Sequence, residues 1–184
     1  MKIALTQRVL YHKGRAYDSI EHGWYRYLQN HTLSFIPNRI DQNFEQLAEE
    51  HDCLIITGGD DSALRRVTEV RLATAMMKQI KPILGVCHGA FMLTDILGGS
   101  TYVHQDGHMD TTHLVTYAGK QQTVNSYHSH AISKLHSSAT SLAQDLDGNH
   151  EAWIDKNIAG IVWHPERMDT PWIPIEISNL MQIG

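Results

Sequence analysis

The stretch that decides the fold runs Lys81-Pro82-Ile83-Leu84-Gly85-Val86-Cys87-His88-Gly89-Ala90-Phe91-Met92-Leu93. Its first half is a short apolar run typical of a buried strand, and its second half has the apolar spacing of a helix. The change falls at Gly85-Val86-Cys87-His88-Gly89, which has the layout of a nucleophile elbow. We therefore predict a sharp turn that exposes Cys87, with glycines where larger side chains would collide and a helix N-terminus that favours the thiolate. The alternative is an ordinary strand–helix turn with a buried cysteine.

A second motif, Trp163-His164-Pro165-Glu166, offers a base for such a nucleophile. Residues 158 to 163 are typical of a strand, so His164 is expected at a strand end. A cysteine nucleophile needs a base, and the base needs a group that orients it. Because residues i and i+2 of an extended chain share a face, Glu166 is predicted to hold the His164 imidazole. The alternative for this motif alone is a surface histidine beside a solvated glutamate.

Four blocks of sequence resemble the class I glutamine amidotransferases, and more closely their single-domain γ-glutamyl hydrolase relatives. In chain order they are Ile55-Ile56-Thr57-Gly58-Gly59-Asp60, Gly85-Val86-Cys87-His88-Gly89, Val124-Asn125-Ser126-Tyr127-His128 and Trp163-His164-Pro165-Glu166. The resemblance covers most of the chain. It implies a flavodoxin-like α/β fold and a hydrolase that cleaves a γ-glutamyl amide through a thioester on Cys87, with His164 and Glu166 completing the catalytic triad. It implies no metal and no organic cofactor.

The resemblance also assigns residues around this triad. It places half of an oxyanion hole at Gly58 and Gly59, where the alternative is a plain turn, and the other donor at the backbone N–H of His88. Three further positions are implied to hold the amino-acid end of the bound glutamyl group: Ser126, Tyr127 and His128. The alternative for these three is a strand end with a tucked tyrosine.

Two positions bear on the substrate. Many members of the family carry glutamine four residues after the nucleophile, where this chain has Phe91, which favours a differently built or larger γ-glutamyl substrate over free glutamine. Phe91 as a core residue is the alternative. The opening Thr6-Gln7-Arg8 resembles a branch linked to bacterial surface-polysaccharide pathways, which cleaves a nucleotide-activated amidate such as γ-glutamyl-CDP-amidate. In that reading Arg8 contacts a phosphate; otherwise it is a surface arginine.

Two other function classes compete with a free-standing hydrolase. The chain could be the glutaminase subunit of a two-part amidotransferase, delivering ammonia to a separate synthetase. It could also be a catalytically dead binding module on the same fold. The presence of all three triad residue types, Cys87, His164 and Glu166, favours an enzyme over the binding module.

The length, charge and cysteine content of the chain limit its domain count, its partners and its compartment. The 184 residues are enough for one well-cored domain, which we place at 1–184. A net charge of −5 gives no electrostatic reason to expect nucleic acid or an anionic membrane as a partner. No apolar run approaches the ~18 residues of a membrane span, and the first residues enter a strand without a signal-peptide layout. The two cysteines, Cys53 and Cys87, suggest a reducing cytoplasm.

The first half of the chain alternates strands with helices, which predicts a doubly wound, mostly parallel sheet with helices on both faces. The expected strands are Lys2–Thr6, Leu33–Ile36 and Cys53–Thr57, and the expected helices are Tyr17–Leu28, Phe44–His51 and Ala63–Gln79. The last of these helices is expected to begin after a cap at Asp60-Asp61-Ser62. Much of its apolar face is expected to come from Leu64, Val67, Val70, Leu72, Ala75 and Met76.

The second half changes rhythm, with short strands and tight turns that predict antiparallel hairpins extending or flanking the main sheet. These strands are expected at Thr101–His104, His113–Tyr117, Thr123–Ser126, Thr140–Gln144 and Glu151–Asp155, before a closing helix within residues 171–183. The polar positions His104, His108, Asp110 and His113 match no firm metal template and predict a polar loop beside the active cleft. Cys53, inside a predicted strand, is expected to be an inert buried thiol.

Overall fold

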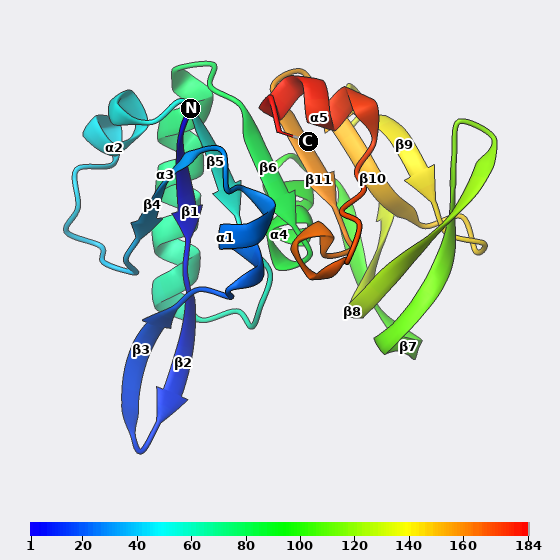
Figure 1. Cartoon of the computed structure of the whole chain (residues 1–184), viewed down its shortest axis with the longest axis horizontal. Coiled ribbons are helices and arrows are strands. Elements are labelled where there is room, and N and C mark those ends of the chain that lie inside the picture. Colours follow the sequence, from blue (N-terminus) through cyan, green and yellow to red (C-terminus); the bar gives the residue numbers. More distant parts are fainter. Residues whose placement is uncertain (184) are drawn as a thin grey trace.

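The buried strands of the chain assemble into one mixed sheet, shown in a computed structural model that describes residues 1–183, with only the backbone described at 105–108 (Figure 1). Within these residues the sheet has the strand order β4-β1-β5-β6-β11-β10-β9-β7-β8. Its parallel strands are β1 (Lys2–Thr6), β4 (Thr32–Ile36), β5 (Cys53–Ile56), β6 (Ile83–Val86) and β11 (Ile158–Ile161). Its antiparallel extension comprises β7 (Ser100–Tyr117), β8 (Lys120–Lys134), β9 (Thr140–Gln144) and β10 (His150–Asp155). The predicted α/β fold, with a parallel core and an added antiparallel region, is confirmed.

Helices cover both faces of this sheet, which explains why its central strands are apolar throughout. One face packs against α1 (Gly23–Tyr27) and α5 (Ile175–Met181), whose Trp24 and Ile177 enter one core cluster. The other face packs against α2 (Phe44–Glu50), α3 (Ala63–Lys78) and α4 (His88–Ile96), which contribute Ala48, Leu72 and Leu93 to a second cluster. Every residue of β5, β6 and β11 is buried, as expected for parallel strands covered on both faces.

Helix α3 begins where the sequence predicts, because the Ser62 side chain accepts a hydrogen bond from the Arg65 N–H. The predicted buried face is confirmed at Leu72, Ala75 and Met76 and is wrong in the first turns. Leu64 and Val67 are 44% and 39% exposed, and the side chains of Arg65 and Glu69 are fully buried instead. The first turns of α3 therefore pack against the sheet through charged groups.

The helix predicted over Tyr17–Leu28 is wrong in its first half. Residues 8–19 form a hairpin of β2 (Arg8–His12) and β3 (Arg15–Ser19), which is a separate two-stranded sheet next to the end of β1 (Figure 1). The turn at Lys13-Gly14 has positive φ at both residues, 49° and 72°, as two-residue hairpin turns favour. Tyr17 pairs with Leu10 across this hairpin and is 49% exposed, so its spacing from Trp24 is not that of a buried helix face.

The polar loop predicted at His104, His108, Asp110 and His113 is also wrong, because these positions belong to the long strand β7. The predicted short strands Thr101–His104 and His113–Tyr117 are parts of β7, and Thr123–Ser126 is part of β8. The pairing of β7 with β8 shifts register twice between residues 103 and 111, and Asp110 has φ of 54° there. These irregularities bend one continuous hairpin instead of ending its strands. The side chain of His108 lies outside the described residues.

The remaining elements agree with the sequence prediction. Strands β9 and β10, helix α2 and the closing helix α5 lie at or within a residue or two of the expected positions or ranges. Among the helices that the structure describes, none combines the length and the apolar character needed to cross a membrane.

We expect Leu84→Ala to lower the free energy of unfolding by about 2–5 kcal/mol, because Leu84 is fully buried in the central strand β6 and its loss leaves a cavity. The control Leu146→Ala removes a side chain that is 69% exposed and should change the same free energy by less than about 0.5 kcal/mol. Urea unfolding followed by circular dichroism measures both. Equal losses for the two variants would contradict the placement of β6 in the core.

Candidate active site

Cys87 sits in a strained turn between β6 and α4. Its φ of 51° and ψ of −106° are unusual for a residue with a side chain, and such conformations persist only where the surroundings enforce them. Here the Cys87 N–H donates to the carbonyl of Ile161 at 2.8 Å, and a Cβ on residue 85 would collide with the backbone of Gly89. The thiol therefore lies at the N-terminus of α4. Cys87 is only 8% exposed, so the predicted exposure is limited to its place on a cavity wall.

His164 follows β11 and is held from three sides. The Asn125 side chain accepts from the His164 N–H and donates to its carbonyl, each at 2.8 Å. The ring Nδ1 lies 2.7 Å from Glu166 Oε1, and the ring shares the wall of one cavity with Cys87. Gly58 packs directly on the imidazole, so that a Cβ at this position would collide with ring atom Cε1. The ring consequently has one available position, between the carboxylate and the thiol.

Glu166 belongs to a short 3-10 helix, η1 (Pro165–Arg167), that packs against α1. Its side chain is almost fully buried. Gly23 of α1 approaches so closely that a Cβ there would collide with the Glu166 carbonyl, and Arg26 donates to this same carbonyl at 3.3 Å. Helix α1 thus fixes the backbone that carries the carboxylate.

The surroundings of His164 favour its charged form. Burial lowers the pKa of the imidazole, but its hydrogen bonds to Cys87 and Glu166, together with the charges of these two groups, outweigh burial and raise the pKa to about 9. At neutral pH the imidazole is therefore protonated beside the thiol. This arrangement can keep a thiolate ready for attack and a proton ready for a leaving group.

The second cysteine has the opposite environment. Cys53 is 1% exposed inside β5, and burial, with a smaller contribution from the charge of Asp52, raises the pKa of its thiol to about 12. A thiol with this pKa is not ionised at neutral pH and is a poor nucleophile.

A cavity of about 380 Å³ opens beside the thiol, within the size range of small-molecule sites. Its wall includes Cys87, His164, Gly59 and His88, whereas the other predicted triad and oxyanion positions, Glu166 and Gly58, line a smaller pocket that Arg8 and Trp24 also border. Phe91 also lines it, and its ring lies 6.1 Å from that of His128. The charged residues on the wall are of both signs: Asp60, Asp61, Asp95, Arg66 and Arg167.

Of the four predicted substrate contacts, two line this cavity and two do not. Tyr127 lines the cavity and meets the His164 ring edge-on, with centroids 5.5 Å apart. His128 also lines it, and its Nδ1 donates to the His130 carbonyl at 2.7 Å. Ser126 is fully buried and is not on the wall of this cavity. Arg8 is not on this wall either: it lies 3.7 Å from Glu21, on the side of Gly58 that faces α1.

Sequence reasoning missed two residues of this site, Arg167 and Asn125. Arg167 lines the cavity, pairs with Glu21 at 2.8 Å and lies 4.4 Å from the centroid of the Tyr127 ring. Its place directly after the His-Pro-Glu motif was a usable signal. Asn125 was part of a recognised block, but only the folded chain shows that it pairs with the backbone of His164.

One group of side chains among the described residues could hold a metal ion: His113 of β7, His128 of β8 and Glu151 of β10. Their nearest ligand atoms lie within 4.8 Å of one another, with His113 Nε2 3.3 Å from Glu151 Oε2. Two histidines and a glutamate are a ligand set that zinc accepts, and the two rings here face the same buried carboxylate. This group differs from the set His104, His108, Asp110 and His113 that was considered from the sequence.

The family model for class-I glutamine amidotransferases matches residues 15–180. The chain belongs to this family. Membership places it among amidohydrolase and amidotransferase enzymes and agrees with the α/β fold described above.

Individual relatives of the family are distant. The chain is 27% identical to a gamma-glutamyl-CDP-amidate hydrolase of Campylobacter jejuni, over 91% of this chain and 90% of that protein. It is 28% identical to the carbamoyl phosphate synthase small chain of Aquifex aeolicus, over 65% of this chain and 34% of the other. A glutamine amidotransferase structure from Thermotoga maritima superposes with a TM-score of 0.72 at 16% identity, covering 98% of this chain and 80% of that one. The last likeness concerns the fold alone.

The pH dependence of turnover should report the His164–Glu166 pair. With the His164 pKa raised to about 9, the imidazolium that protonates a leaving group is present below this pH and lost above it, so kcat/KM should fall above about pH 9. Glu166→Gln removes a charge that raises this pKa, so the alkaline limb should move to lower pH. The control Glu45→Gln, at an exposed ion pair with Lys78, should leave the limb in place. An unchanged limb in Glu166→Gln would contradict the pairing.

The same pair contributes to stability in a defined pH range. The folded-state pKa of His164 lies above its ordinary value of 6.5. The contribution of this pair to the free energy of unfolding is therefore fully present below about pH 6.5 and is lost as the pH rises through about 9.

Iodoacetamide at pH 7 should modify Cys87 and leave Cys53 intact, because only Cys87 borders the cavity and Cys53 has a raised thiol pKa. Peptide mass spectrometry locates the adduct, and Cys87→Ala should show none under the same conditions. Comparable modification of both thiols would count against an activated Cys87.

Proposed function

We propose that the protein is a cysteine-dependent hydrolase that cleaves a γ-glutamyl amide and releases glutamate. The observation that carries the proposal is the meeting of Cys87 and His164 on the wall of one cavity, with the His164 ring held 2.7 Å from the Glu166 carboxylate. A nucleophile, a base and a group that orients the base are the parts that acyl transfer through cysteine requires. Membership of the amidotransferase family supports the same class of reaction.

In the proposed first step, Cys87 Sγ attacks the γ-carbonyl carbon of the substrate. The carbon–sulfur bond forms as the carbonyl π electrons move to oxygen, and the N–H groups of Gly58 or Gly59 and of His88 stabilise this oxyanion. His164 then gives its proton to the leaving nitrogen, the carbon–nitrogen bond breaks, and a γ-glutamyl thioester remains. Water, deprotonated by His164, attacks the thioester and releases glutamate, which regenerates the Cys87 thiolate beside a protonated His164. The scheme uses no metal and no organic cofactor.

We further propose γ-glutamyl-CDP-amidate as the substrate, in bacterial capsule or surface-polysaccharide biosynthesis. Three observations support a substrate larger than glutamine: the name of the Campylobacter relative, the size of the cavity, and Phe91 on its wall. Arg66 lies on the same wall, half exposed and 3.2 Å from Asp61, and is the side chain that we propose to meet a phosphate. Arg8 is a weaker candidate for that contact, because it does not line this cavity. Free thiols at both cysteines fit a reaction in the cytoplasm.

A glutaminase subunit is the second candidate function. The carbamoyl phosphate synthase small chain to which this protein is similar is, by its name, one part of a larger enzyme. In that reading the protein would deliver ammonia from glutamine to a separate synthetase and would release little glutamate alone. A catalytically dead binding module fits the structure less well, because it gives no reason for the His164–Glu166 pair beside Cys87.

Release of glutamate from a panel of γ-glutamyl amides tests the proposal. We expect wild-type protein to hydrolyse γ-glutamyl-CDP-amidate faster than glutamine or γ-glutamyl polyamines, Cys87→Ala to fall to background, and Cys53→Ala to keep its activity. Turnover by Cys87→Ala would overturn the mechanism. Hydrolysis of polyamine conjugates alone would exclude the nucleotide substrate and keep the hydrolase, and activity only after adding a synthetase would select the glutaminase subunit.

A further inference from the structure

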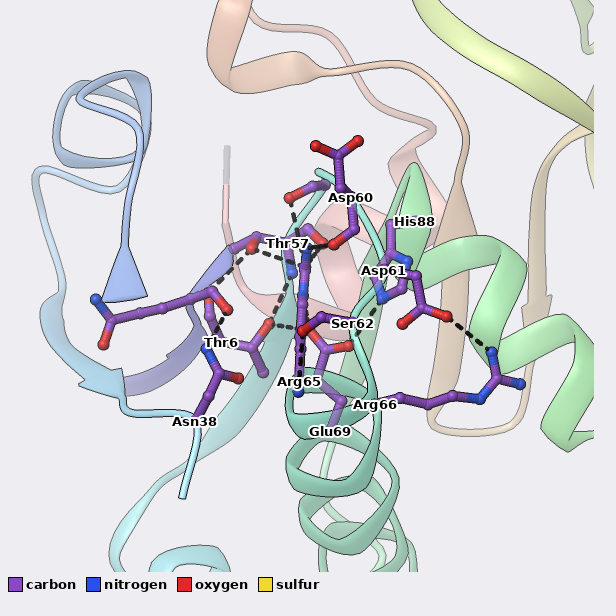
Figure 2. Close-up of polar contacts among 12 residues, drawn as sticks. Thr6, Asn38, Thr57, Asp60, Asp61, Ser62, Arg65, Arg66, Glu69 and His88 are labelled. Atoms are coloured by element: carbon purple, nitrogen blue, oxygen red, sulfur yellow. Dashed lines mark hydrogen bonds and ion pairs between the residues drawn. The ribbon is translucent and has the colours of Figure 1, made fainter. Parts of the chain in front are cut away.

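Helix α3 carries a charged pair beneath the active site. Arg65 and Glu69 are both fully buried, and Arg65 Nε lies 2.8 Å from Glu69 Oε1. Burying two charges costs desolvation energy that their attraction repays only in good geometry, so such a pair is weak evidence for a stabilising role. Its other contacts reach both segments that carry the proposed oxyanion donors, as Figure 2 shows.

Arg65 binds the loop after β5 through its carbonyl groups. Its Nη2 donates to the carbonyl oxygen of Thr57 at 2.6 Å and lies 3.4 Å from that of Gly58, and its Nη1 donates to that of Asp60 at 3.1 Å. In a trans peptide the carbonyl and the following N–H point in opposite directions, and the described chain has no cis peptides. With the carbonyls of Thr57 and Gly58 turned toward α3, the N–H groups of Gly58 and Gly59 point away from it.

Glu69 connects this loop to the nucleophile. Its Oε1 accepts from Thr6 Oγ1 at 2.7 Å as well as from Arg65, and its Oε2 lies 2.8 Å from Nε2 of His88. His88 is the residue directly after Cys87. One buried carboxylate therefore touches the end of β1, the side chain that holds the glycine loop, and the residue whose N–H is the second proposed donor.

We propose that Glu69 is a positioning residue that sets the two oxyanion donors relative to each other, through Arg65 on one side and His88 on the other. The inference rests on the proposed acyl-transfer function. The two donors belong to different strand–helix units some thirty residues apart, so no local turn fixes their separation. Donors of this kind act only when placed at hydrogen-bond distance from the developing oxygen, which makes a rigid connection between them valuable.

The rates at which Cys87 reacts with two different reagents separate this positioning role from an effect on general stability. p-Nitrophenyl acetate acetylates Cys87 as the thiolate adds to the ester carbonyl, the π electrons move to oxygen, and the resulting oxyanion collapses to expel p-nitrophenolate. Iodoacetamide alkylates Cys87 by direct displacement of iodide, with no oxyanion. The ratio of the two rates thus measures oxyanion stabilisation and is independent of which amide is the true substrate.

We expect Glu69→Gln to slow acetylation by about 10- to 100-fold, below or near the effect of losing a whole donor, and to change alkylation by less than about two-fold. His88→Ala keeps its N–H but cuts the same connection, so it should lower the ratio in the same direction. Because both variants act through one link, the double variant should be no worse than the more damaging single one. The control Glu45→Gln, which frees Lys78 on the exposed face of α3, should leave the ratio unchanged.

An unchanged ratio in Glu69→Gln, or multiplicative losses in the double variant, would overturn the proposal. If circular dichroism shows that Glu69→Gln does not fold, His88→Ala decides alone, since the His88 side chain lies at the cavity and is 11% exposed. An unchanged ratio in His88→Ala would then overturn it. Failure of the γ-glutamyl hydrolase assignment would appear in the amide panel and not in this ratio.

Discussion

The parallel pairing of β6 with β11 is the constraint on which the site depends. Val86 lies opposite Ile161, so the residues that follow these two strands emerge at the same edge of the sheet. Cys87 then donates its N–H to Ile161, which extends the pairing by one step and holds the nucleophile against the neighbouring strand. His164 follows after only two further residues. A register slip of one residue would turn every side chain of a strand to the other face. It would also bring a side chain to the place of Gly85 or Gly160, where a Cβ would collide with Gly89 or Trp153.

Local signals in the sequence were enough to predict the parts of the site that lie within one segment. The elbow is encoded by five consecutive residues. The predicted contact between His164 and Glu166 forms, but residues 165 to 167 are a 3-10 helix and not the extended chain that the prediction assumed. The helix predicted over Tyr17–Leu28 is wrong in its first half because the same kind of local signal can be misleading. Aromatic side chains on an exposed hairpin, such as Tyr17, repeat at intervals that resemble a helix, and only the tight turn at Lys13-Gly14 distinguishes the two.

The contacts that sequence could not predict are those between charged or polar groups from distant segments. Periodicity placed Leu64 and Val67 on the buried face of α3, because apolar residues are the usual indicators of burial. The structure turns Arg65 and Glu69 inward because their partners are already there: backbone carbonyls of the glycine loop, the hydroxyl of Thr6 and the ring of His88. Asn125 was missed for the same reason, since an amide that pairs with a distant backbone leaves no pattern in its own neighbourhood.

Two carboxylate–histidine pairs flank Cys87, and their surroundings give them different capacities. Glu166 and His164 lie 2.7 Å apart, and the His164 ring shares a cavity wall with the Cys87 thiol, so a proton can pass between the imidazole and a reacting group. Glu69 and His88 lie 2.8 Å apart, but here the carboxylate also holds Arg65, which ties the pair to the scaffold. A buried carboxylate and its partner stabilise each other only in good geometry. Both pairs therefore depend on the rigid apolar strands beside them. The most buried part of the sheet is thus also the part that can hold charged groups in fixed positions next to a reactive sulfur.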